Sequence, residues 1–535
     1  MAFYVLSVIY PLTSAYLLLL PTENKIVKFY DNLSVNINDE NKLIGLAFII
    51  VTLATNLYAI SQKRKFEVFV GSVYSFCALI GLFAGDFISL FAALEIMMLL
   101  ASILIFCGQH KNSTMAARQY FLTHLLASTL ILIGISYIIN QNSSIQIIPL
   151  TTLIETKSSI FYFLILSGYL INIAVPPFSG WMVNCYPYAS SSGIIYLTSF
   201  TSKVAIIIIL KLFSGLEILK FFGLLMIIYG GIYACIEDNI KRVICYLTIS
   251  QLGFMLIAIG TKSDQIACSI PVFLFLHICY KALFSLYVAI LTDKELIENF
   301  SDIKIAWSIK NPLLLGSLLL SILLIISFPI ISSFTIKLFI TSILSKDISY
   351  YGILFLKIIT PIAVFSTIKY KNISRGFSPS LSVLTKLSLF TMLLFTLIIS
   401  VWLEQGFKLL NLSYPLSIYK VNWQEIIDQL LIILIAILLT KLVNRIISRH
   451  STSSINLDLF RGTEKVFHMI YFKYHHKITQ SEHWDVREEY NIFNSIDKTT
   501  LRKIKSLHNQ STSLFIIMTL LIMLTIYLSS RMNSL

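Results

Sequence analysis

The sequence predicts an all-α, polytopic membrane protein of about 14–16 transmembrane helices, and three observations support this fold class. Hydrophobic residues make up 56% of the 535 residues and charged residues only 13%, whereas soluble domains carry about 25% charged residues. About fifteen apolar stretches approach the roughly 20 residues that a helix needs to cross a bilayer. These stretches lack the alternating pattern of membrane β-barrels, and lipid otherwise admits only helices as spanning elements.

The apolar stretches follow one another along almost the whole chain. Their approximate cores are 2–20, 43–61, 66–84, 87–107, 117–139, 159–176, 192–213, 221–236, 243–260, 270–292, 312–344, 350–368, 387–403, 429–447 and 512–529. The first twenty residues have no basic segment and no small-residue cleavage site before Pro21, so we expect a membrane anchor rather than a signal peptide. We predict five regions: an N-terminal anchor region (1–65), a central core (66–345), C-terminal helices (346–447), a basic amphipathic segment (448–511) and a final transmembrane helix (512–535).

Proline positions predict that two of the helices are discontinuous. Residues 172–177 (NIAVPP) interrupt the stretch 159–176, and residues 327–333 (SFPIISS) interrupt 312–344, which is too long for one straight crossing. Proline removes a backbone donor and clashes with the preceding turn, so it ends or kinks a helix. A pair of broken helices in separate halves of a membrane protein is typical of transporters built from inverted repeats.

Charge is distributed unevenly between the predicted loops. If the stretches alternate in direction, roughly 26 Lys and Arg lie on one side of the membrane against roughly 10 on the other, and the richer side is expected to be cytoplasmic. The N-terminus and the segment 448–511 are then cytoplasmic, in what we expect to be a bacterial inner membrane. This bias accounts for the net charge of +14 without a nucleic-acid partner.

Common catalytic and cofactor-binding patterns are missing from the sequence. The seven cysteines show no C-x-x-C spacing, so neither a disulfide framework nor a zinc site is predicted. The chain also has no Walker loop, dinucleotide fingerprint, haem ligand pair or catalytic triad. We therefore expect no metal, no cofactor and no enzyme activity of its own.

Charged and titratable residues inside the apolar stretches are the main functional signal. His277 and Lys281 lie four residues apart in 270–292 and so share one face of a helix; Glu95, Lys203 and Lys337 lie in three other stretches. A charge at the bilayer centre costs about 2.5–3.5 kcal/mol on insertion scales, so such groups face protein or water and often mark ion pathways. The simplest structural alternative is a static ion pair between Glu95 and Lys203.

Eight short motifs occur in a fixed order within the predicted core. They occupy 85–95, 177–181, 186–187, 199–205, 240–246, 250–253, 277–283 and 334–337. This ordered set resembles the large antiporter-like subunits shared by Mrp-type cation/proton antiporters and respiratory complex I, and most of all the D subunit of the Mrp antiporters. The resemblance implies that the core translocates protons. It assigns proton transfer to Glu95, Lys203, His277, Lys281 and Lys337, and a polar path to Asn172, Ser250 and Gln251.

Three departures from the family pattern keep other functions open. Many members have lysine where this chain has Asn172, histidine where it has Phe273, and glycine near Ser327. The resemblance therefore leaves three hypotheses. The first is a proton-translocating, D-like subunit of a multi-subunit Na⁺/H⁺ antiporter, the second a complex I membrane-arm subunit, and the third a scaffold that no longer conducts. The expected partners are sister subunits, protons, Na⁺ and membrane lipid.

Overall fold

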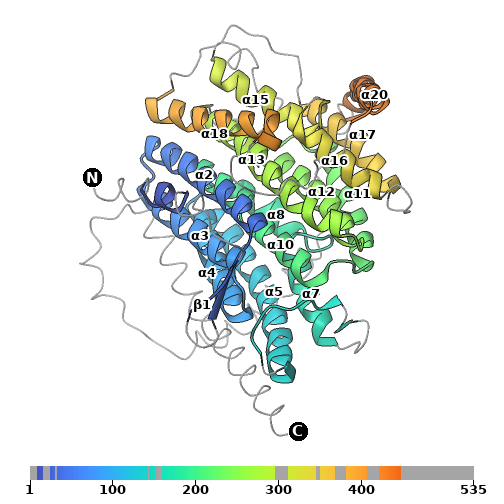
Figure 1. The fold of residues 1–535 in the computed structure, drawn as a ribbon. Helices are drawn as coiled ribbons and strands as arrows, with labels where there is room; N and C mark the ends of the chain where they lie inside the picture. The colour runs from blue at the N-terminus through green and yellow to red at the C-terminus, as the bar shows by residue number, and fades with distance from the viewer. Residues whose placement is uncertain are drawn as a thin grey trace, which may run out of the picture.

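A computed structural model of the protein describes residues 9–15, 25–29, 33–142, 144–151, 153–154, 160–295, 311–329, 331–344, 350–367, 381–405 and 421–447. These residues form a helical bundle (Figure 1). Its helices are α2 (Asp39–Ser61), α3 (Lys65–Phe83), α4 (Phe87–Phe106), α5 (Ser113–Asn142), α7 (Ile160–Asn172), α8 (Gly180–Cys185), the 3₁₀ turn η1 (Tyr186–Tyr188), α9 (Ser191–Ser199), α10 (Thr201–Phe213), α11 (Ile218–Ile236), α12 (Ile240–Ile259), α13 (Asp264–Glu295), α15 (Pro312–Ile325), α16 (Ser332–Ile343), α17 (Tyr350–Thr367), α18 (Val383–Val401) and α20 (Trp423–Ile447).

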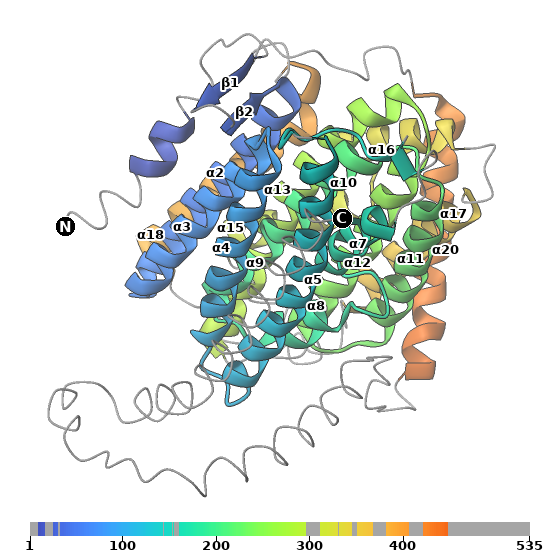
Figure 2. The ribbon, with the colours of Figure 1, turned by 90° about the horizontal axis from the view of Figure 1, so that it is seen from below.

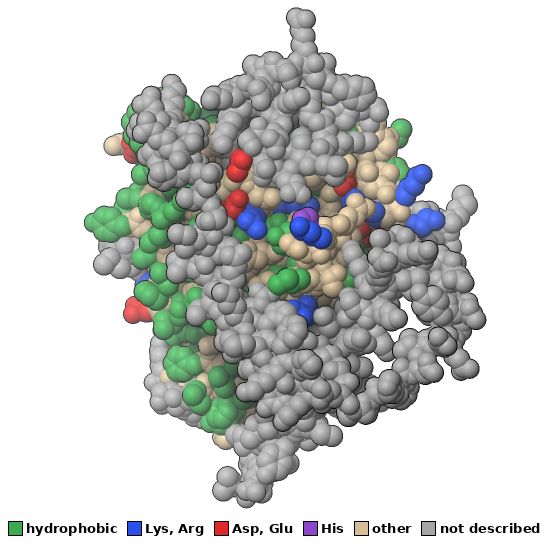
Figure 3. All heavy atoms as spheres, turned by 180° about the vertical axis from the view of Figure 1, so that it is seen from behind, with side chains coloured by type: hydrophobic (Ala, Val, Ile, Leu, Met, Phe, Trp, Pro, Cys, Tyr) green, Lys and Arg blue, Asp and Glu red, His purple; other side chains and the backbone are tan. Residues whose placement is uncertain are grey.

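The helices confirm the predicted all-α membrane fold. Within the described residues, ten spans are long and apolar enough to cross a bilayer, and four shorter apolar helices accompany them. Seen from behind, hydrophobic side chains cover one flank of the described surface, while most charged side chains in this view gather near its middle (Figure 3). The predicted amphipathic segment 448–511 and the stretch 512–529 lie outside the described residues, as does most of 2–20.

A short β-hairpin, which the sequence analysis did not anticipate, lies outside the helical bundle (Figure 2). Its strands β1 (Lys25–Phe29) and β2 (Leu33–Ile37) pair antiparallel. The N–H of Ser34 in β2 donates to the carboxylate of Asp86 (2.9 Å), which also caps α4 by accepting from the N–H of Ser89 (2.7 Å). Asp86 therefore fastens the hairpin to the start of α4.

The first predicted break lies where expected. Helix α7 ends at Asn172 and α8 begins at Gly180. Ala174 has a left-handed backbone (φ 61°). The N–H groups of Ala174 and Val175 donate to carbonyls three and five residues earlier (3.0 and 3.1 Å). This pattern is a Schellman cap, which satisfies the last carbonyls of a helix.

The second predicted break has the same geometry. Helix α15 ends at Ile325 and α16 begins at Ser332. Ser327 has φ 54°, and the N–H groups of Ser327 and Phe328 donate to carbonyls three and five residues earlier (3.3 and 2.9 Å). Both discontinuous helices therefore end in a Schellman cap with a residue other than glycine in the left-handed position. This match agrees with an inverted repeat, which stays a prediction.

A third break divides a stretch that the sequence analysis treated as one helix. Residues 192–213 form α9 and α10, separated at Phe200, whose φ and ψ of −114° and −68° lie outside the ideal helical values. The ring of Phe200 packs edge-on against Phe48 and Tyr74, at 4.9 and 5.4 Å between centroids. The break places Lys203 in the first turn of α10.

Helix α13 lies at the centre of the bundle. It contacts α2, α9, α10, α12, α15, α16 and α18, and its apolar span is buried throughout. Helix α12 packs closely on α11, because a Cβ atom on Gly223 would lie only 2.6 Å from the carbonyl oxygen of Gly253. Helix α20 lies at the rim beside α17 (Figure 2). Side chains on α12 and α13 are therefore held away from lipid.

An ion-pair cluster ties the α2–α3 connection to the end of α13. Arg64 Nη2 lies 2.9 Å from Asp293 Oδ1, and Tyr58 donates its hydroxyl to the other oxygen of that carboxylate (2.5 Å). The buried carboxylate of Glu67 lies 3.9 Å from Arg64. Burial opposes the charge on Arg64, but the carboxylates of Asp293 and Glu67 outweigh it and raise the pKa of the guanidinium.

Candidate functional site

Four of the five predicted proton-transfer residues form one buried cluster. Lys203 on α10, His277 and Lys281 on α13, and Lys337 on α16 are 0%, 0%, 1% and 8% exposed. All three lysines lie close enough to His277 to act on it electrostatically. Residues more than 130 positions apart in the sequence are thus brought together in the protein interior.

Lys203 is held by the broken segment between α9 and α10. Its ammonium group donates to the carbonyl of Thr198, the penultimate residue of α9, and to the hydroxyl of Ser202 (3.2 Å). The Phe200 break leaves carbonyls at the end of α9 without the partners of a continuous helix. The local backbone therefore provides the site that positions this lysine.

The two residues on α13 have few partners. Among the described residues, Lys281 Nζ hydrogen-bonds to the carbonyl of Ile244 on α12 at 3.5 Å, and neither ring nitrogen of His277 has a hydrogen-bond partner there. Cys245 on α12 lies close to both Lys281 and Lys203. Buried polar atoms without partners are rare in folded proteins and often mark sites for water or for a functional role.

The predicted polar-path residues on α12 are buried and lack hydrogen-bond partners. Neither the hydroxyl of Ser250 nor the amide atoms of Gln251 has a hydrogen-bond partner among the residues that the structure describes. Ser250 lies against α11, because a Cβ atom added to Gly230 on α11 would be 3.0 Å from the Cβ atom of Ser250. Ser250 therefore faces the tight contact between α11 and α12.

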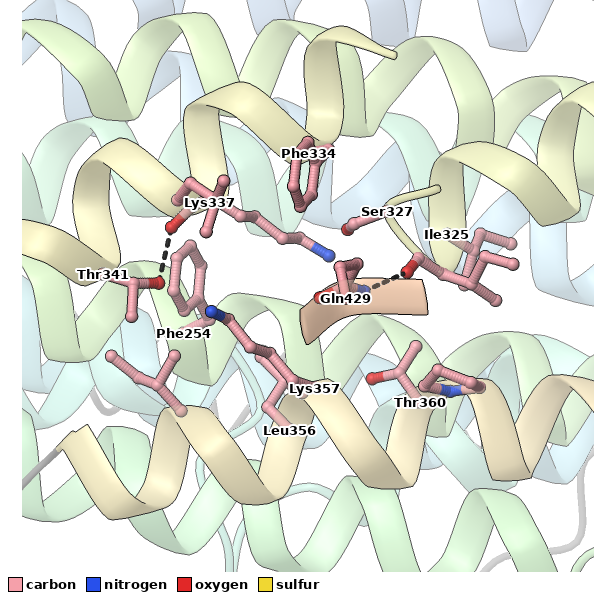
Figure 4. A pocket seen from close by; sticks show the side chains of 14 residues that line it. Phe254, Ile325, Ser327, Phe334, Lys337, Thr341, Leu356, Lys357, Thr360 and Gln429 are labelled. Carbon is pink, nitrogen blue, oxygen red and sulfur yellow. Dashed lines mark hydrogen bonds between the residues drawn. The ribbon is translucent and has the colours of Figure 1, made fainter. Parts of the chain in front are cut away.

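Lys337 reaches from the cluster into a pocket between α12, α15, α16, α17 and α20 (Figure 4). Its ammonium group lies 5.5 Å from the centre of the Phe273 ring, at a distance typical of a cation–π contact. Lys357 on α17 points into the same pocket, which the side chain of Gln429 also lines (Figure 4). The pocket has room for about one water molecule.

Glu95, the fifth predicted residue, lies apart from the cluster. Its carboxyl group faces the side chain of Ser128 on α5, and its Oε1 atom is buried with no hydrogen-bond partner within the described ranges. Among the described residues no ion pair joins Glu95 to Lys203, so the static pair considered as an alternative is not formed. Glu95 therefore belongs to a separate polar region between α4 and α5.

His124 on α5 is a buried titratable residue that the sequence analysis missed. Its Nδ1 lies 2.9 Å from Oδ1 of Asn172, the polar-path residue at the end of α7. The signal was present, since His124 lies inside the apolar stretch 117–139 just as His277 lies inside 270–292. The three residues Glu95, His124 and Asn172 thus belong to one region around α5.

The arrangement of the cluster suits proton transfer rather than fixed charge pairing. Within the described part of the chain, none of Lys203, Lys281 and Lys337 forms an ion pair with a carboxylate. Like charges that are buried close together disfavour one another's charged forms. Fixed pairing with carboxylates therefore does not account for these three lysines among the described residues. The described residues include no group of His, Cys, Asp or Glu that could hold a metal ion.

The fold and this buried titratable cluster define a polytopic, antiporter-like membrane subunit. The chain belongs to the NADH:quinone oxidoreductase/Mrp antiporter transmembrane family, whose model matches residues 84–366, more than half of the chain. The predicted family membership is confirmed. The assignment of a particular subunit type is a separate question.

The chain is similar in sequence to subunits of NADH-quinone and NADH-ubiquinone oxidoreductases. The chain is 24% identical over 319 residues to NADH-quinone oxidoreductase subunit N of Parvibaculum lavamentivorans, covering 55% of this chain and 65% of that protein. It is 28% identical over 213 residues to NADH-ubiquinone oxidoreductase chain 2 of Rhizopus oryzae, covering 37% and 40%. The matches thus span less than two thirds of each of these relatives.

Solved structures share the fold at low sequence identity. A chain of the Mrp complex from Dietzia sp. DQ12-45-1b superposes with a TM-score of 0.65 at 15% identity, covering 76% of this chain and 90% of that one. A chain of respiratory complex I from Thermus thermophilus gives a TM-score of 0.62 at 16% identity, covering 76% and 93%. The similarity extends over most of each solved chain.

Proposed function

We propose that this chain is a proton-translocating subunit of a multi-subunit membrane assembly. Protons move through the central cluster of Lys203, His277, Lys281 and Lys337. One observation carries the proposal: four titratable side chains meet in the buried interior without a carboxylate partner among the described residues. A packing role would not require so many costly buried cations, since apolar residues of similar size fill a membrane interior at no such cost.

The pocket beside Lys337 extends the proposed path toward the rim of the bundle. Lys357 lies across this pocket from Lys337, and Thr360 and Gln429 add polar atoms to its wall. Two residues on α20, Glu425 and Asp428, interact electrostatically with Lys357. A proton on Lys337 could therefore pass by water to Lys357 and on to these carboxylates.

The names of the relatives bear on which assembly the chain joins. The curated relatives described above are subunits of NADH-quinone or NADH-ubiquinone oxidoreductases. Their names support the complex I membrane-arm alternative more than the D-type antiporter subunit that the sequence motifs suggested. In either assembly this chain would couple proton movement to a reaction or ion flux supplied by sister subunits. A cytoplasmic N-terminus is part of the proposal for either assembly, and Na⁺ as the exchanged cation belongs to the antiporter version.

Lys281→Ala in the native assembly tests translocation against the scaffold alternative. Proton transfer by a positioned group contributes about 10²–10⁴-fold to rate, so we expect proton movement in membrane vesicles to fall by at least about 100-fold, with the amount of inserted chain unchanged. Lys281→Arg should be equally inactive, because arginine keeps its charge and does not release protons. Lys262→Ala, which changes an exposed lysine before α13, is the control and should be neutral.

The outcome separates the hypotheses. Normal proton movement in Lys281→Ala would favour the non-conducting scaffold. Co-purification of the native chain, followed by mass spectrometry, distinguishes the two assemblies. Hydrophilic iron–sulfur subunits would indicate the complex I type, and small membrane subunits of an antiporter would indicate the Mrp type.

A further inference from the structure

A second small buried cavity is lined by none of the four residues of the central cluster. It is bounded by α4, α5, α7 and α10 and has room for about one water molecule. Most of its wall is apolar, and four of its lining residues carry polar side chains: His124, Ser128, Asn172 and Thr201. The central cluster does not account for this polar site.

His124 is the titratable group in the wall of this cavity. It is 3% exposed, and Nδ1 lies 2.9 Å from Oδ1 of Asn172. A carbonyl oxygen only accepts hydrogen bonds, so Nδ1 carries the hydrogen and Nε2 of the neutral ring carries the lone pair. Nε2 is buried and has no hydrogen-bond partner in the part of the chain that the structure describes. The ring therefore presents a proton acceptor in a cavity that can hold water.

Aromatic neighbours fix the orientation of the His124 ring. Tyr120 lies 4.2 Å and Trp181 lies 4.5 Å from it, measured between ring centres. The indole N–H of Trp181 donates to the carbonyl of Ile171 (2.8 Å), which holds the indole in place beside the end of α7. The packing and the Asn172 contact together restrict rotation that would exchange the two ring nitrogens.

The cavity lies between two of the predicted proton-transfer residues. Ser128, one turn after His124 on the same face of α5, faces the carboxyl group of Glu95 on α4. Thr201 also lines the cavity; it lies two residues before Lys203 in the first turn of α10 and hydrogen-bonds to Tyr74. The wall of the cavity therefore adjoins Glu95 through Ser128 on α5 and Lys203 through Thr201 on α10.

We propose that His124 is the proton-carrying residue that links Glu95 to Lys203. This inference rests on the proposed function. The carboxylic acid of Glu95 gives a proton, through the Ser128 hydroxyl or cavity water, to Nε2 of His124, which leaves a carboxylate and an imidazolium. Nε2 then releases that proton to water beside Thr201, and the neutral amine of Lys203 accepts it. Nδ1 keeps its hydrogen bond to Asn172 throughout, so the asparagine positions the ring without titrating.

The test uses vesicles containing the native assembly with His124→Gln or His124→Lys. Glutamine fills a similar space and can hydrogen-bond to Asn172 but cannot titrate, whereas lysine can. We expect the Gln variant to move protons at least about tenfold more slowly than wild type. The Lys variant should be several-fold faster than the Gln variant. The matched control is His110→Gln on the α4–α5 connection, which should leave the rate unchanged. The amount of inserted chain is measured for each variant.

Each result decides the proposal. A His124→Gln rate equal to wild type would overturn it, and so would a Lys variant no faster than Gln at equal protein level. If the Gln variant does not insert, proton movement in the Lys variant supports the proposal and its absence overturns it. Lys281→Ala is run in parallel. A defect in Lys281→Ala without one in His124→Gln rejects only the role of His124, whereas normal rates in both reject the proposed function itself.

Discussion

Ser327→Gly is expected to stabilise the protein, although glycine usually weakens helical proteins. Ser327 ends α15 with φ 54°, and an L-residue in this left-handed region costs about 1–2 kcal/mol that glycine avoids. Glycine in return loses more freedom on folding, about 0.5–1 kcal/mol. The Ser327 hydroxyl has no hydrogen-bond partner among the described residues, so its removal breaks no hydrogen bond there. The net gain should be about 0.5–1 kcal/mol.

Ser321 on α15 supplies the matched control. It is also a buried serine, but it lies inside the regular helix, six residues before Ser327. Glycine there has the same effect on the unfolded chain and relieves no strain, so Ser321→Gly should destabilise by about 0.5–1 kcal/mol. Alanine variants at both positions correct for the lost hydroxyl groups. The Ala-to-Gly difference between the two positions then isolates the backbone and should be about 1–2 kcal/mol.

The measurement is SDS-induced unfolding of the full-length chain in mixed micelles, followed by far-ultraviolet circular dichroism. The two Ala-to-Gly changes should alter the free energy of unfolding with opposite signs. Equal destabilisation at Ser321 and Ser327 would refute the left-handed cap between α15 and α16.

Two further stability predictions use the same assay. Asp86→Ala removes the cap of α4 and leaves the Ser34 amide unpaired, so it should cost about 2 kcal/mol or more. Asp39→Ala, at a partly exposed ion pair, should cost less than about 1 kcal/mol, and equal losses would contradict the role of Asp86. A double-mutant cycle on Arg64 and Asp293 should give a coupling energy above about 1.5 kcal/mol, because both charges are largely buried. A coupling energy near zero would contradict a stabilising ion pair between Arg64 and Asp293.

Local sequence patterns predicted the helical fold and the positions of the breaks after α7 and α15. Hydropathy and helix-breaking proline act over short segments, so the chain itself specifies where α7 and α15 end. The spacing of His277 and Lys281 likewise fixed their common face on α13, because helical periodicity requires no knowledge of the neighbouring helices. The break at Phe200 was missed, since no proline or glycine marks it and ring packing from α2 and α3 accompanies it.

Contacts between helices were decided only by the tertiary structure. The sequence allowed Glu95 to pair with Lys203, yet packing places Glu95 beside Ser128 and leaves Lys203 on the carbonyl of Thr198. The meeting of His124 with Asn172 likewise depends on how α5 packs against the end of α7. The sequence by itself determined which helices carry buried titratable groups. Which of those groups meet depended on helix packing, because distances between separate helices are set by the side chains at every contact and by no periodic signal along the chain.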